Sequence, residues 1–96
     1  MKKTGYLLAN PDIVFRKEKE GAFLFNPDTG DLKVLNTVGA MIWEICDGKH
    51  TEEALLENLS NMFIDVSESD LEKDIKNFIK ELEDRGLIGY IYEGTE

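Results

Sequence analysis

The chain has 96 residues and a mass of 10.9 kDa, which leaves room for one domain, spanning residues 1–96, with a modest core. Eleven basic against twenty acidic residues give a net charge of −9, which argues against a general polyanion binder because phosphate contacts depend on Lys and Arg. The single cysteine excludes an internal disulfide, and no apolar run is long enough for a membrane span or a secretory signal, so we expect a cytoplasmic protein.

The first third of the chain predicts a meander of three short antiparallel strands, at residues 13–15, 22–25 and 31–35. β-Branched and aromatic residues fill the first two strands. In the third, Leu32 and Val34 alternate with Asp31 and Lys33, as expected when one face is buried and the other is wet. Residues 26–30, with the sequence Asn-Pro-Asp-Thr-Gly, give the strongest turn signal in the chain.

The rest of the chain predicts three helices and a short tail. The first helix follows an N-cap at Asn36 or Thr37 and is predicted to end at Asp47-Gly48. Thr51 caps the second helix, and the third runs about four turns, from its cap at Ser67 to Arg85. Residues 87–92 then suit an extended strand that closes the core. The fold class is therefore α+β and winged-helix-like, a three-stranded antiparallel sheet followed by three helices.

No pattern of catalytic or metal-binding residues is present, and we expect neither an enzyme nor a cofactor. The only histidine, His50, lies beside the cap of the second helix, where a solvated or capping role is typical. The only cysteine, Cys46, lies near the end of an amphipathic helix and is expected to be a small apolar core residue. Nucleotide-binding loops and zinc motifs are absent from the sequence.

A helix-turn-helix architecture permits DNA binding, so a winged-helix regulator is one hypothesis. The third helix, from Ser67 to Arg85, carries four basic residues against seven acidic ones, and this balance argues against phosphate contacts. The alternatives are peptide recognition, in which an extended peptide adds a strand to an open edge of the sheet, and dimerisation through that edge. The third strand contains no proline, so its full row of backbone donors and acceptors is available.

Several short motifs together carry a family resemblance. A Leu-Asn step leads into a helix that ends in Cys-Asp-Gly, and Asp-Ile-x-x-Phe-Ile-x-x-Leu follows downstream. The matching segments are residues 13–16, 21–27, 35–40, 42–48, Thr51, 74–79, Leu82 and 86–88. With these features, over about residues 11–88, the chain resembles the PqqD-like family, peptide chaperones also called RiPP recognition elements (RiPPs being ribosomally made, post-translationally modified peptides).

The resemblance implies a non-catalytic domain that binds the leader of a precursor peptide and presents its core segment to a modifying enzyme, often a radical SAM enzyme. The leader is expected to lie as an added strand beside the third strand, at Asp31, Leu32, Lys33, Val34 and Leu35. On the third helix, the family pattern places Asp74 and Phe78 in the site. Helical geometry adds Lys73, Asn77 and Glu81 as neighbours at the rim of the groove.

The resemblance leaves the product open, because similar domains serve pyrroloquinoline quinone, lasso peptide, sactipeptide and other pathways. The charge pattern bears on the leader. Residues 1–48 carry a net charge of −1 and residues 49–96 a net charge of −8, so a strongly acidic leader is disfavoured unless the rim lysines screen it.

Overall fold

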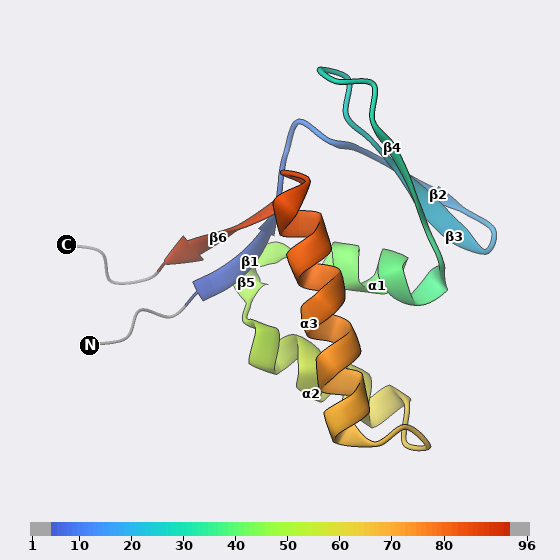
Figure 1. Ribbon diagram of the computed structural model, residues 1–96, viewed down its shortest axis with the longest axis vertical. Helices are drawn as coiled ribbons and strands as arrows, with labels where there is room; N and C mark the ends of the chain where they lie inside the picture. The colour runs from blue at the N-terminus through green and yellow to red at the C-terminus, as the bar shows by residue number, and fades with distance from the viewer. Residues whose placement is uncertain (1–4, 93–96) are drawn as a thin grey trace.

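The computed structural model describes residues 5–92, which form two small antiparallel sheets and three helices (Figure 1). The elements in chain order are β1 (Gly5–Ala9), β2 (Val14–Glu18), β3 (Gly21–Phe25), β4 (Leu32–Leu35), α1 (Thr37–Ile45), β5 (Asp47–His50), α2 (Glu52–Met62), α3 (Glu68–Asp84) and β6 (Ile88–Tyr92). The predicted α+β class, with a three-stranded sheet ahead of three helices, is confirmed.

The predicted meander forms the sheet β2-β3-β4, which we call the wing sheet. The turn between β3 and β4 is built as expected: the Asn26 side chain accepts a hydrogen bond from the N–H of Asp28 (2.9 Å), and Gly30 has a φ of +79°. The hairpin between β2 and β3 requires Gly21, because a Cβ there would lie 2.2 Å from the carbonyl oxygen of Leu35.

A second sheet, in the order β5-β1-β6, was only partly foreseen. Its strand β6 coincides with the predicted tail strand, whereas β1 and β5 were not predicted. The first helix stops where predicted, since α1 ends at Ile45 with Cys46 as its C-cap and Gly48 has a φ of +84°. The sequence did not predict that Asp47 and Gly48 belong to a strand, β5. The physical reason is pairing with β1, which begins where the N–H of Ala9 donates to the carbonyl of Cys46 (2.9 Å).

The three helices begin at the predicted caps. The side chain of Asn36 accepts from the N–H of Gly39 (2.7 Å), that of Thr51 from Ala54 (3.1 Å), and that of Ser67 from Asp70 (3.2 Å). Each cap satisfies a backbone donor that has no partner inside its own helix. In the part of the chain that the structure describes, no helix has the length and apolar character needed to cross a membrane.

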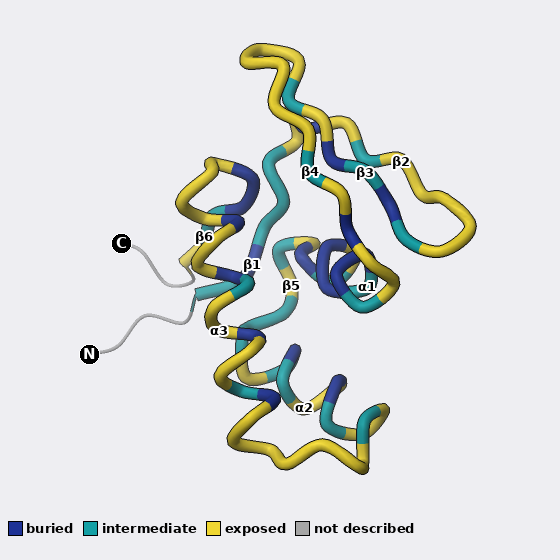
Figure 2. Tube along the Cα trace, turned by 45° about the vertical axis from the view of Figure 1, so that its right-hand side comes forward, coloured by how far each residue is buried: buried dark blue, intermediate teal, exposed yellow. Residues whose placement is uncertain are grey.

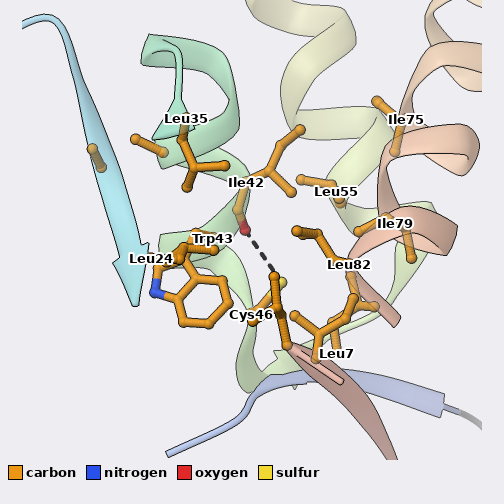
Figure 3. Close-up of a cluster of buried hydrophobic side chains, with 14 of the residues drawn as sticks. Leu7, Leu24, Leu35, Ile42, Trp43, Cys46, Leu55, Ile75, Ile79 and Leu82 are labelled. Carbon is orange, nitrogen blue, oxygen red and sulfur yellow. Dashed lines mark hydrogen bonds between the residues drawn. The ribbon is translucent and has the colours of Figure 1, made fainter. Parts of the chain in front are cut away.

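Buried side chains from both sheets and all three helices form one core (Figure 3). Leu7 of β1, Leu24 of β3, Leu55 of α2 and Leu82 of α3 are almost fully buried in it. Figure 2 shows that buried positions line the inner sides of the elements, whereas the wing hairpin at residues 16–20 is exposed. The core thus fixes the wing sheet against α1 and leaves its far end in solvent.

Candidate functional site

The candidate site begins at the open edge of β4. Within residues 5–92, β4 pairs only with β3, and the tail strand β6 pairs with β1 in the other sheet. The backbone N–H of Asn26 donates a hydrogen bond to the carbonyl of Asp31 (2.9 Å). This bond shows which of the paired residues of β3 and β4 are hydrogen-bonded to each other. Because bonded pairs alternate along antiparallel strands, Lys33 and Leu35 bond to β3, and the N–H and C=O groups of Leu32 and Val34 face the open edge.

Side chains of β4 alternate between two environments. Leu35 is buried and Lys33 is half-buried, and both lie on the side of the helices. Leu32 and Val34 project to the other face and are 54% and 66% exposed. The expectation of a buried face with Leu32 and Val34 and a wet face with Asp31 and Lys33 is therefore wrong, because Leu35 packs into the core and places Lys33 on the same, inner side. Asp31 directly precedes the strand and is exposed. The predicted segment 31–35 therefore combines an unpaired backbone edge with a buried inner row, which is the arrangement that strand addition requires.

A groove of about 490 Å³ lies beside this edge, between β4 and the helices. Its lining is mostly apolar, with few polar side chains. The lining residues are Lys33, Val34, Leu35, Asn36, Val38, Gly39, Ile42, Leu59, Phe63, Val66, Leu71, Asp74, Ile75 and Phe78. Five of the ten predicted site residues line this groove, two of them (Asp74 and Phe78) on α3. An extended peptide on β4 would therefore direct alternate side chains into an apolar slot.

Two ion pairs join β4 and its preceding residue to α3. Lys33 Nζ donates to Glu81 Oε2 (2.8 Å) and lies 5.9 Å from the centre of the Phe78 ring. Arg85 Nη1 is 4.0 Å from Asp31 Oδ2, at the end of α3. The hydrogen bond from Lys33 lowers the pKa of Glu81 below its ordinary value, so this rim carboxylate is ionised at neutral pH.

The remaining predicted residues, Lys73 and Asn77, are exposed on α3 and do not line the groove. They lie one position before Asp74 and Phe78, which turns them by about 100° around the helix. Glu81, which we predicted from the same geometry, reaches the site through Lys33 and does not line the groove itself. A role of Lys73 and Asn77 in peptide binding stays a prediction.

Sequence reasoning missed the floor of the groove, which comes from α1, α2 and the segment after α2. Gly39 is the position that carried a signal. A glycine inside a helix costs about 1 kcal/mol relative to alanine, so it calls for a packing reason. Here a Cβ on Gly39 would lie 3.3 Å from the Phe78 ring, so the glycine leaves room for this ring against α1. Phe63 and Val66 gave no comparable signal.

The two candidate nucleophilic or basic side chains lie away from the groove lining. Cys46 is buried, its Sγ donates to the carbonyl of Ile42 (3.3 Å, dashed in Figure 3), and burial raises its pKa to about 12. His50 Nδ1 is 2.9 Å from a carboxylate oxygen of Asp47. Among residues 5–92, no three His, Cys, Asp or Glu side chains are grouped as a metal site would require. The protonated thiol of Cys46 is a core residue, as predicted.

Comparison with known proteins decides the family. The model of the family described as coenzyme PQQ synthesis protein D (PqqD) matches residues 21–88, which include β3, β4 and all three helices. The chain belongs to the PqqD family. This match covers more than half of the chain and confirms the resemblance found in the sequence. PqqD-like recognition elements are generally non-catalytic. A search of curated proteins found no match.

Two solved structures share the PqqD-like fold of this chain. One is TbiB1 in complex with the TbiA(beta) leader peptide, with a TM-score of 0.75, 20% identity, and coverage of 93% of this chain and 98% of that chain. The other is the heterocyclase TruD, with a TM-score of 0.61 and 17% identity. That match covers 96% of this chain and 12% of TruD, so there the fold is a small part of a much longer protein.

Proposed function

We propose that this PqqD-family chain binds the leader of a ribosomally made precursor peptide and delivers it to a peptide-modifying enzyme, a radical SAM enzyme or one of another class. The observation that carries the proposal is the open edge of β4 beside the apolar groove. The leader adds as a strand to Leu32 and Val34, and its inward side chains enter the groove between β4 and α3. The TbiB1 structure, with a leader peptide bound to the same fold, supports this proposal.

The chain itself performs no chemistry in this proposal. Cys46 is buried and protonated, and the groove lining offers one lysine, one asparagine and one aspartate among apolar side chains. Lys33 is held by Glu81. Such a surface recognises an extended peptide through its backbone and its apolar side chains, and the modifying enzyme supplies the reaction. No observation favours the DNA-binding alternative, since α3 is predominantly acidic.

A proline substitution tests strand addition directly. Val34→Pro removes an N–H that faces the open edge and keeps the ladder to β3, so the fold tolerates it. The matched control is Lys17→Pro on β2. Hydrogen-bonded pairs alternate along β2 and β3 as well, so the N–H of Lys17 faces the opposite open edge of the wing sheet. The ligand is the synthetic leader of the precursor encoded beside the gene for this chain, and affinity is measured by titration calorimetry.

We expect Val34→Pro to weaken leader binding at least about tenfold, or ~1.4 kcal/mol, while Lys17→Pro binds as the wild type does. Backbone amide shifts of residues 31–35 should move on titration, together with those of α3 facing the groove. Equal binding by Val34→Pro and wild type, or shifts confined to other parts of the chain, would contradict the proposal. Circular dichroism of both variants checks that they fold.

A further inference from the structure

The outer face of the wing sheet is apolar, although it faces away from the core. Its register aligns Val14, Phe25 and Leu32 in one row across the three strands. The next row on the same face holds Arg16, Phe23 and Val34. Val14 is 52% exposed and Phe25 38% exposed, so these side chains lie open to solvent in the described part of the chain. We call these two rows the outer patch.

An antiparallel sheet with one wet face normally carries polar side chains there. The wing sheet instead is apolar on both faces, since Phe15, Leu24 and Leu35 of its inner face pack into or against the core. The outer patch is also hollowed, with a depression of about 340 Å³ lined by Val14, Arg16, Phe23, Phe25 and Leu32. A contiguous exposed apolar face of this kind marks a protein interaction surface.

The outer patch is continuous with the leader site, because Leu32 and Val34 belong to both. A leader strand paired with β4 places alternate side chains in the groove and the others on the outer face, next to Leu32 and Val34. Once the leader is bound, the outer face is therefore made partly of protein and partly of leader. A partner that contacts this composite face binds the loaded complex more tightly than the empty chain.

Tighter binding to the leader-loaded chain than to the empty chain suits the enzyme that modifies the bound peptide. A second copy of this chain fits the patch less well, because each copy carries a net charge of −9 and the patch itself spans only three short strands. The only cation in the two rows is Arg16, whose side chain is 78% exposed and lies 3.4 Å from Glu18. An apolar surface with a carboxylate opposite Arg16 matches this face.

We propose that the outer patch is the docking surface for the peptide-modifying enzyme, and that the enzyme contacts both the patch and the outward side chains of the bound leader. The proposal rests on the proposed function, because it requires the leader on β4. It adds the surface that the enzyme uses and the coupling between the two binding events: leader and enzyme each strengthen binding of the other by the same factor.

Charge substitutions test the patch without touching the leader edge. Val14→Glu lies two strands from β4, and Arg16→Glu changes an exposed side chain whose loss leaves the fold intact. The matched control is Ile91→Glu on β6, an apolar strand residue of the other sheet that is 43% exposed. The probes are the modifying enzyme and the synthetic leader encoded beside the gene for this chain, with the affinity for the enzyme measured with and without the leader.

We expect the wild type to bind the enzyme at least about tenfold more tightly with the leader present. Val14→Glu and Arg16→Glu should each lose about tenfold or more of that affinity, or ~1.4 kcal/mol, and keep the leader affinity of the wild type. Ile91→Glu should match the wild type in both measurements.

The outcomes separate the two proposals. If the wild type binds no leader, the proposed function fails and this inference fails with it. If the leader binds but both patch variants bind the enzyme as the wild type does, or Ile91→Glu loses as much affinity as they do, only the docking surface is overturned. A wild-type dimer in light scattering that Val14→Glu dissociates would overturn it too, and would assign the patch to a second copy.

Discussion

The two sheets of this chain have the same number of strands but differ in how they are built and in what they leave open. In the wing sheet, each strand pairs with its neighbour in sequence through a tight turn. In the sheet β5-β1-β6, the central strand comes from the beginning of the chain and pairs with segments about 40 and 80 residues away. The first sheet is local and projects from the body, while the second ties distant parts of the chain together.

This difference separates stability from binding. The second sheet buries Leu7 completely and packs against the helices, so its loss would release the N- and C-terminal parts of the fold together. The wing sheet buries only one face and leaves an edge and an apolar outer face for partners. Substitutions in the two sheets should therefore affect different measurements.

The largest expected effect is on stability, from truncation in the second sheet. Leu7→Ala removes a fully buried side chain from β1 and should lower the free energy of unfolding by about 2–5 kcal/mol. The matched substitution in the wing sheet is Leu32→Ala, which removes a side chain that is 54% exposed and should change stability by less than about 1 kcal/mol. Urea unfolding of both variants measures the difference. Similar losses would show that the wing sheet stabilises the fold as much as the other sheet does.

A smaller effect is expected on peptide affinity from the wall of the groove. Phe78→Ala removes a ring that lines the groove and should weaken leader binding about tenfold, or ~1.4 kcal/mol. The control is Tyr92→Ala, which truncates a half-exposed aromatic residue on β6 and should leave leader affinity unchanged. Calorimetric titration with the leader compares the variants at a temperature where both are folded. An equal loss of leader affinity in the two variants would contradict a specific role of the groove in leader binding.

The smallest effect concerns the ion pair between β4 and α3. Lys33 lowers the pKa of Glu81 from its ordinary value of 4.5, so the pair stabilises the fold fully above that value. Its contribution is lost as the pH falls through the lowered pKa of the folded chain. Glu81→Gln should therefore cost less than about 1 kcal/mol at neutral pH, and the difference from wild type should vanish in acid.

Thermal unfolding across the acid range measures how the stability difference between Glu81→Gln and the wild type depends on pH. Hydrogen exchange of the β4 amides at neutral pH is the second measurement. The control is Glu72→Gln, which removes an exposed ion pair to Lys76 within α3 (3.1 Å) and does not involve β4. If only Glu81→Gln raises the hydrogen exchange of β4 amides, the ion pair holds the wing sheet to the helices. If neither variant or both variants do so, the pair has no such role.

The same contrast explains how much of the fold could be predicted. The wing sheet and the helix starts depend on local chemistry, namely the turn at residues 26–30 and the caps Asn36, Thr51 and Ser67, and these predictions are confirmed. Strand β5 has the sequence Asp-Gly-Lys-His, which carries no strand signal, and it is extended because β1 pairs with it. Pairing over about 40 residues is a tertiary effect that local propensity does not contain.

The candidate site also contains residues that the sequence predicted and residues that it did not. The edge residues of β4 and the residues Asp74 and Phe78 followed from the family resemblance, and the structure brings these two next to β4 in one groove. The alternation along β4 was assigned to the wrong faces, because Leu32 and Val34 are exposed on the outer face of the sheet. The contributions of Leu59, Phe63 and Val66 did not follow, because their place depends on how α2 packs against α3. A pattern of apolar residues shows which face of a helix is buried but not which neighbour it meets.

The pairing of β1 with β6 sets Gly5 opposite Tyr92, so the two ends of the described chain leave the molecule side by side (Figure 1). Both exits lie on the sheet that takes no part in the groove, away from the wing. A tether attached at either position, whether a fluorescent tag, a surface anchor or a fused protein, would leave the peptide slot unobstructed. The architecture thus suits a recognition module that is joined to another protein through a linker or inserted into a longer chain.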